Sequence, residues 1–164
     1  MTRRRRFAAA RQAWAHLLHP RPATARSRAD DLASLVPLLD RAAFLQPEAE
    51  QVIRECAAPG KVAEDLAKRG NAVVVGYWQL RRDLLPVEVS PAGRSVKDEI
   101  QRLLLYHEWS VHEAVDCAVS PQQTARMTAA RAQMHGLGAP AARLRELRRD
   151  LTHEQAMLGE ARDS

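Results

Sequence analysis

The stretch "LLLYHEWSVHEAVDCAV", residues 103–119, decides how this 164-residue chain is expected to fold. A helix turns by about 100° per residue, which gathers the apolar residues of this region on one face. That face comprises Val96, Ile100, Leu103, Leu104, His107, Val111, Ala114, Val115 and Ala118. The pattern predicts a long helix over residues 95–119, with His107 as a hydrogen-bonded residue of the core.

The polar residues of the same stretch first suggest a metal site. His107 and His112 are five residues apart, so they lie about 140° from each other on a regular helix and cannot bind one ion. Glu108, His112 and Asp116 follow each other at intervals of four and share the outer side, which makes them the candidate metal ligands. Neighbouring charged residues on a solvated helix face explain the same spacing. We expect no cofactor.

Leu105 and Trp109 also lie on the outer side of this helix. An exposed leucine and tryptophan are typical of a surface that contacts another protein. The alternative is that a second layer of helices covers them.

The rest of the chain is rich in alanine, leucine and arginine, and only 4% of its residues are aromatic, which favours helices. Prolines and glycines divide it into further segments with helical patterns, at residues 3–18, 29–44, 47–57, 60–85, 121–135 and from 140 onward. The β-branched run in 60–85 is typical of a strand, but apolar residues at intervals of three, four and seven favour a helix there.

The expected fold is therefore all-α. It is a single-domain bundle of six or seven helices, with residues 60–85 and 95–119 as its central pair. Two prolines at 20 and 22 separate it from the chain start. Residues 1–28 then form a basic amphipathic helical arm and linker, and residues 29–160 form the bundle domain.

Charge is distributed unevenly along the chain, whose net charge is +5. Residues 1–28 hold eight arginines and no acid. Arginines of this kind bind phosphates and other anions. The candidate residues for an anionic partner are Arg3, Arg4, Arg5, Arg6 and Arg11 in the arm, with Arg143, Arg145, Arg148 and Arg149 in the last helix. The arm also carries the candidates for membrane contact, Phe7, Trp14 and Leu18.

Signatures of enzymes are missing from the sequence: it has no nucleophile elbow, no phosphate-binding loop and no dinucleotide motif. Cys56 and Cys117 are far apart in sequence, which favours reduced thiols and a cytoplasmic location. No apolar run approaches the ~20 residues that a membrane-spanning helix needs.

These observations predict a non-enzymatic, cytosolic helical interaction protein, whose basic arm binds nucleic acid or an acidic protein. Two alternatives remain open. One is a peripheral membrane protein that uses the same amphipathic arm. The other is a metal-dependent helical-bundle enzyme built on Glu108, His112 and Asp116. The oligomeric state is left open.

Overall fold

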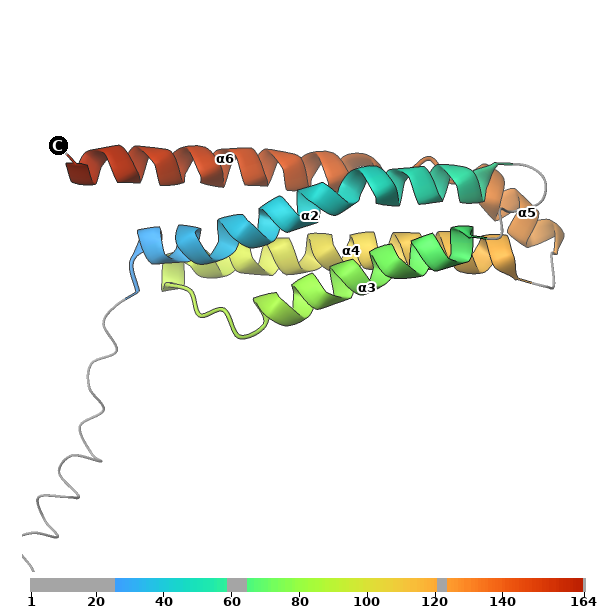
Figure 1. Ribbon diagram of the computed structural model, residues 1–164, viewed down its shortest axis with the longest axis horizontal. Coiled ribbons are helices and arrows are strands. Elements are labelled where there is room, and N and C mark those ends of the chain that lie inside the picture. The colour runs from blue at the N-terminus through green and yellow to red at the C-terminus, as the bar shows by residue number, and fades with distance from the viewer. Residues whose placement is uncertain (1–25, 59–64, 121–123, 164) are drawn as a thin grey trace, which may run out of the picture.

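The computed structural model describes residues 26–58, 65–120 and 124–163 of the chain. Their helices are α2 (Arg28–Ala57), α3 (Leu66–Leu84), the 3-10 turn η1 (Pro91–Gly93), α4 (Arg94–Val119), α5 (Ala125–Ala132) and α6 (Gly138–Asp163) (Figure 1). No strand occurs among the described residues, so the all-α class is confirmed. The described residues form five α-helices instead of the expected six or seven. The helix expected at 3–18 lies outside them.

The helices expected at 29–44 and 47–57 are in fact one helix, α2, which contains both Pro37 and Pro47. Each proline lacks a backbone N–H and bends a helix, and α2 does change direction along its length (Figure 1). Both prolines are exposed, whereas apolar residues on both sides of them are buried. Burial of one continuous apolar face therefore outweighs the local preference to end the helix.

The centre of the bundle is the pair α2 and α4, and not the expected pair 60–85 and 95–119. Within the described residues, α2 and α4 pack against each other and against both α3 and α6, while α3 and α6 do not meet. Contacts of Asp31 with Ser90, and of Gln46 with His107, show that α2 and α4 run parallel. On the side of α3 away from this core, Trp78 is exposed, and so is Leu85 just after the helix end.

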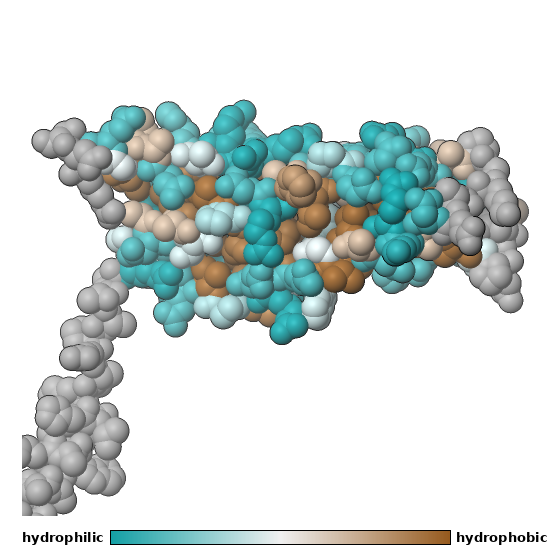
Figure 2. Space-filling model, in the orientation of Figure 1, coloured by the Kyte–Doolittle hydropathy of each residue, from teal (hydrophilic) through white to brown (hydrophobic). Residues whose placement is uncertain are grey.

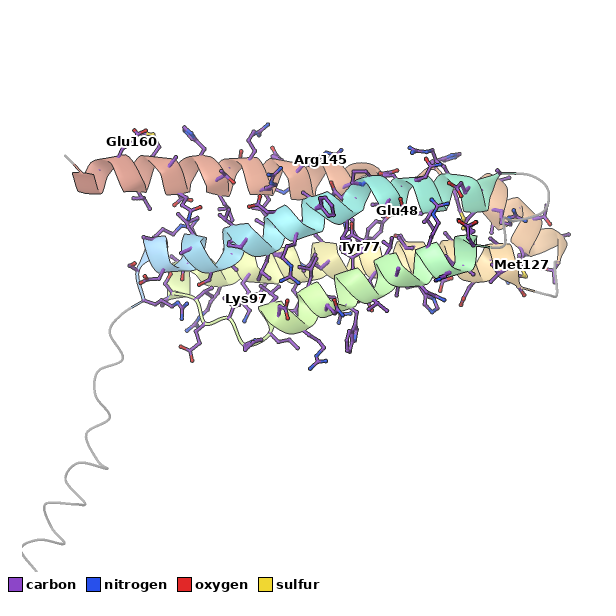
Figure 3. All side chains as sticks on the ribbon, in the orientation of Figure 1. Glu48, Tyr77, Lys97, Met127, Arg145 and Glu160 are labelled. Carbon is purple, nitrogen blue, oxygen red and sulfur yellow. The ribbon has the colours of Figure 1, made fainter. Side chains whose placement is uncertain are left out.

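The stretch 71–78, whose sequence also suits a strand, is helical and belongs to α3. Gly70 allows α3 to approach α4 and α2 closely, because a side chain there would collide with Val115 and press on Val52. Tyr77 points from α3 into the bundle (Figure 3), and its hydroxyl donates to the carbonyl of Ala42 at 3.5 Å. The helical prediction for this segment is confirmed.

The helix ends differ from the expected ones at three places. The α4 helix follows directly on η1, whose first turn is capped by Ser90, so it begins at Arg94 and not at Ser95. The helix expected at 121–135 is the shorter α5, with Thr124 as its cap. The α6 helix begins at Gly138, two residues before Pro140.

Candidate functional site

The outer side of α4 does not assemble the three candidate metal ligands. The Glu108 carboxylate turns toward α3 and pairs with Arg81 at 2.7 Å. His112 and Asp116 remain neighbours, with Nδ1 3.5 Å from the carboxylate oxygen. Within the part of the chain that the structure describes, no group of three or more His, Cys, Asp or Glu side chains is placed to hold a metal ion. The geometry therefore supports a role for Glu108 in a partly buried salt bridge between α4 and α3.

Trp109 and Leu105 lie on the same outer side and are exposed by 57% and 47%. The Tyr106 ring contacts the Trp109 ring, with 6.4 Å between their centroids. No second layer of described helices covers these residues, so the predicted outer position of the pair is confirmed.

The four candidate arginines of α6 all contact other residues of the bundle. Arg143 pairs with Glu99 and Glu146, both at 2.7 Å. Arg148 pairs with Asp40 at 2.6 Å, and Arg145 donates to the side-chain oxygen of Gln46 at 3.2 Å. Arg149 contacts its neighbour Asp150. Arg143, Arg145 and Arg148 tie α6 to α4 and α2, whereas the contact of Arg149 stays within α6, and an anion would have to compete with these contacts.

The other candidates, which are Arg3, Arg4, Arg5, Arg6, Arg11, Phe7, Trp14 and Leu18, lie outside the described residues. The structure does describe the last two arginines of the arm. Arg28 forms a two-bond ion pair with Glu154, both bonds at 2.7 Å, and Arg26 donates to Ser34. Arg28 therefore anchors the start of α2 on α6, while Arg26 bonds to α2 itself and lies 3.9 Å from Glu88.

His107 is the hydrogen-bonded core residue that the helical pattern predicts, and it is fully buried. Its Nδ1 lies 2.6 Å from the carbonyl oxygen of Leu103, which can only accept, so Nδ1 carries the hydrogen. Nε2 is then the acceptor for the side-chain amide nitrogen of Gln46, at 3.1 Å. Burial lowers the pKa of His107 below its ordinary value.

Gln46 completes this buried network and fixes its polarity. Its amide nitrogen also donates to the carbonyl of Ala141, while its oxygen accepts from Arg145. A proton on Nε2 of His107 would therefore face a donor, and a flipped Gln46 amide would lose both of its other bonds. The network joins α2, α4 and α6 and holds the imidazole neutral. Because the ring is closed to solvent, we interpret it as structural and not catalytic.

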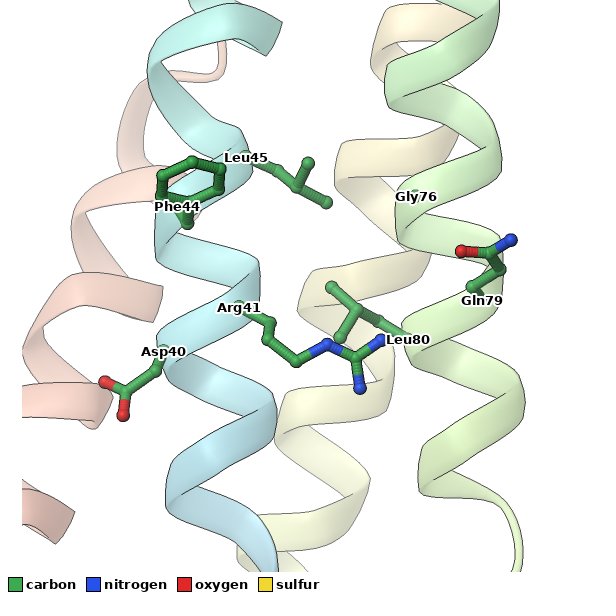
Figure 4. Close-up of a pocket in the computed structure, with 7 residues that line it drawn as sticks. All are labelled: Asp40, Arg41, Phe44, Leu45, Gly76, Gln79 and Leu80. Carbon is green, nitrogen blue, oxygen red and sulfur yellow. The ribbon is translucent and has the colours of Figure 1, made fainter.

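A groove that the sequence did not reveal lies between α2 and α3. It has a volume of about 410 Å³ and is lined by Asp40, Arg41, Phe44, Leu45, Gly76, Gln79 and Leu80 (Figure 4). Apolar residues gather along this part of the surface, with hydrophilic ones on either side (Figure 2). Leu45 packs against the bare backbone of Gly76, and Phe44 is 84% exposed. Phe44 lies off the buried apolar side of α2, which includes Leu35, Leu39 and Ala42.

No protein-family model, curated protein or solved structure matches this chain. Among the described helices, none combines the length and the apolar character needed to cross a membrane.

Proposed function

We propose that this chain is a non-enzymatic, cytosolic helical protein that binds an anionic partner, nucleic acid or an acidic protein, through its N-terminal segment. The supporting observation is the segregation of charge. Residues 1–25 carry six arginines and no acid, a charge of +6, whereas the whole chain carries +5. The remainder, residues 26–164, therefore has a net charge of −1.

Ion pairing within the bundle strengthens this contrast. Arg69 pairs with Glu48 and Glu55, and Arg81 pairs with Glu108. Hydrogen bonds from Arg69 lower the pKa of Glu55, which keeps that carboxylate charged. Opposite charges that are already paired attract a distant anion weakly, whereas a run of arginines without acids attracts it strongly. The attraction should therefore be concentrated in residues 1–25.

Two quadruple variants with the same change in charge test this proposal. One replaces Arg3, Arg4, Arg5 and Arg6 by glutamine. The matched control replaces four exposed cations of the bundle, Lys68, Arg94, Arg102 and Arg126, by glutamine. Affinity for a 20-nucleotide single-stranded DNA and for poly-glutamate is measured by fluorescence anisotropy at low salt.

We expect the arm variant to lose at least about tenfold in affinity for one of the two probes, and the control to lose much less. Equal losses in the two variants would mean that net charge alone drives binding, and would overturn the proposal. The DNA and poly-glutamate results also decide between the two kinds of partner.

Attachment to a membrane through the same segment predicts a different result. Phe7, Trp14 and Leu18 would then enter an anionic bilayer, and the chain would float with phosphatidylserine vesicles. Loss of flotation in Trp14→Glu, with DNA and poly-glutamate binding both absent, would favour the membrane over the anionic macromolecule.

A further inference from the structure

The outward ridge of α2 carries one large apolar side chain among polar ones. Five exposed residues recur along it at intervals of four and three: Pro37, Arg41, Phe44, Glu48 and Gln51. Phe44 stands at the centre and is the most exposed large hydrophobic residue of the described chain. Covering this phenyl ring with a second apolar surface removes it from water, which lowers the free energy.

A cavity able to receive such a ring lies directly beside it. Phe44 forms one wall of the groove between α2 and α3, and Leu45 and Leu80 contribute apolar surface to the same groove (Figure 4). An enclosed apolar cavity of roughly 150 Å³ already holds benzene, so the groove's 410 Å³ can accommodate a phenyl ring. The projecting ring and the cavity are on the same face of one molecule. A twofold-symmetric contact between identical chains requires this arrangement, because each copy supplies both parts.

Under the same twofold symmetry, the charged residues on either side of Phe44 in one copy face residues of opposite charge in the other copy. Arg41 lies one turn before Phe44 and Glu48 lies one turn after it. If two α2 helices cross antiparallel at Phe44, Arg41 of each copy comes close to Glu48 of the other. Arg41 also pairs with Asp83, and Glu48 with Arg69. The Arg41 and Glu48 side chains are about half exposed, and a guanidinium has five donors. Each of the two side chains can therefore take a second partner.

We propose that this chain forms a symmetric homodimer through the outward ridge of α2. In the dimer the α2 helices cross antiparallel at Phe44, and the two Phe44 rings meet in the paired α2–α3 grooves, where aromatic rings gain from offset or edge contact. The Arg41 and Glu48 side chains of the two copies flank the rings and set the antiparallel direction. This inference does not depend on the proposed anion binding.

Sedimentation velocity of the full chain over a range of concentrations tests the dimer. Phe44→Ser removes the central ring, and Trp109→Ser is the matched control, an exposed aromatic residue on α4 away from the groove. Both side chains are exposed, so far-UV circular dichroism should show both variants folded. We expect Phe44→Ser to raise the dimer dissociation constant at least about tenfold and Trp109→Ser to leave it unchanged.

Disulfide trapping tests the direction of the two helices. Two proteins are made on a Cys56→Ala, Cys117→Ser background, one with Arg41→Cys and one with Glu48→Cys. In an antiparallel crossing at Phe44, positions 41 and 48 of different copies are close, while like positions are about 10 Å apart along the axis. We expect the mixture to crosslink faster than either protein alone. Faster crosslinking of either protein by itself would overturn the antiparallel arrangement.

Other results overturn the proposal as a whole. A full chain that stays monomeric up to about 1 mM has no such interface. A dimer that is unaffected by Phe44→Ser uses a different face. A monomer that dimerises only when residues 1–25 are removed would show that the chain's own N-terminal segment occupies the groove in place of a second copy.

Discussion

His107 of α4 accepts at Nε2 from Gln46 of α2, whose amide also donates to the carbonyl of Ala141 in α6. Its Nδ1 donates to the carbonyl of Leu103 within α4, so both ring nitrogens have a partner. Charged side chains on α2 and α6 also affect the pKa of His107. Glu50 of α2 acts to raise its pKa and Arg145 of α6 acts to lower it, while burial dominates and lowers it. The rings of Tyr77 from α3 and Tyr106 from α4 complete its surroundings.

This histidine should make the bundle less stable in acid. Its pKa in the folded chain lies below the ordinary 6.5, so the unfolded chain takes up the proton at a higher pH than the folded chain. The free energy of unfolding should fall as pH drops below about 6.5, by at most about 1.4 kcal/mol per pH unit, until the folded-state pKa is reached.

Urea unfolding between pH 7.5 and 5.5 measures this effect. His107→Gln keeps a group that can accept from Gln46 but does not titrate, so its stability should depend less on pH than that of the wild type. His112→Gln, on the exposed side of α4, leaves His107 and its hydrogen bonds in place, so it should keep the loss of stability in acid that His107 causes. An unchanged pH dependence in His107→Gln would contradict the role assigned to the ring.

Cys56 should be unreactive in the folded chain. Its side chain is fully buried, and burial is the main cause that raises its pKa to about 11. Only the thiolate attacks a disulfide reagent. In a Cys117→Ser protein at pH 8, we expect an aromatic disulfide reagent to label Cys56 no faster than the chain unfolds. Labelling at the rate of a free thiol would contradict the burial.

At the scale of the helices, Gly70 sets how closely α3 approaches α4. An added Cβ there would overlap Val115 and lie 3.3 Å from Val52. Overpacking a core costs about 1–3 kcal/mol, while replacing a helical glycine by alanine gains about 1 kcal/mol. Gly70→Ala should therefore destabilise the chain by up to about 2 kcal/mol.

Gly159→Ala is the matched control, because nothing lies within 4 Å of a Cβ at that position of α6. It should stabilise the chain by up to about 1 kcal/mol in chemical unfolding. If Gly70→Ala were stabilising to the same extent, α3 and α4 would not be packed as closely as described.

The sequence predicts a helix and its buried side correctly where the geometry of one regular helix determines both. The angular positions in α4 predicted its buried side, including Ile100 and His107, because a straight helix repeats its geometry without outside help. The same rules wrongly separated the helix at 29–44 from the one at 47–57 near Pro47, since they omit the apolar burial on both sides of that proline.

Which helices pack against one another was not predictable from the sequence. An apolar stripe shows which side of a helix avoids water, but not whether another helix reaches it, and so α3 was wrongly placed at the centre. The groove needs Phe44 from α2 and Gly76 from α3, which only the packed bundle brings together. Glu108 faces Arg81 for the same reason, a contact that separates it from the metal ligands expected on its own helix.

At the scale of the whole molecule, the proposed dimer would carry two anion-binding segments. Each α2 begins at Arg28, sixteen residues before Phe44. An antiparallel crossing at Phe44 therefore separates the two starts by roughly 50 Å. The two N-terminal segments would leave the dimer at opposite ends.

This separation predicts a dependence on ligand length if the partner is nucleic acid. A 20-base-pair duplex spans both starts, since its length is about 68 Å, whereas an 8-base-pair duplex of about 27 Å does not. Binding by two segments should give the longer duplex an advantage of at least about tenfold in affinity over the shorter one, measured by anisotropy at equal salt. Phe44→Ser should lose this advantage, and a variant that keeps it would separate anion binding from dimer formation.

The central claim is that the arginines of the N-terminal segment bind the anion. The salt dependence of binding to duplex DNA, or to poly-glutamate if that probe binds more tightly, tests it most directly. Each arginine–phosphate contact contributes about 0.9 to the slope of log affinity against log salt on duplex DNA, so replacing Arg3, Arg4, Arg5 and Arg6 by glutamine should flatten that slope by 3 to 4. On poly-glutamate we expect a clear flattening by the same variant. An unchanged slope in this variant, with a flattened slope when Lys68, Arg94, Arg102 and Arg126 are replaced, would contradict the claim.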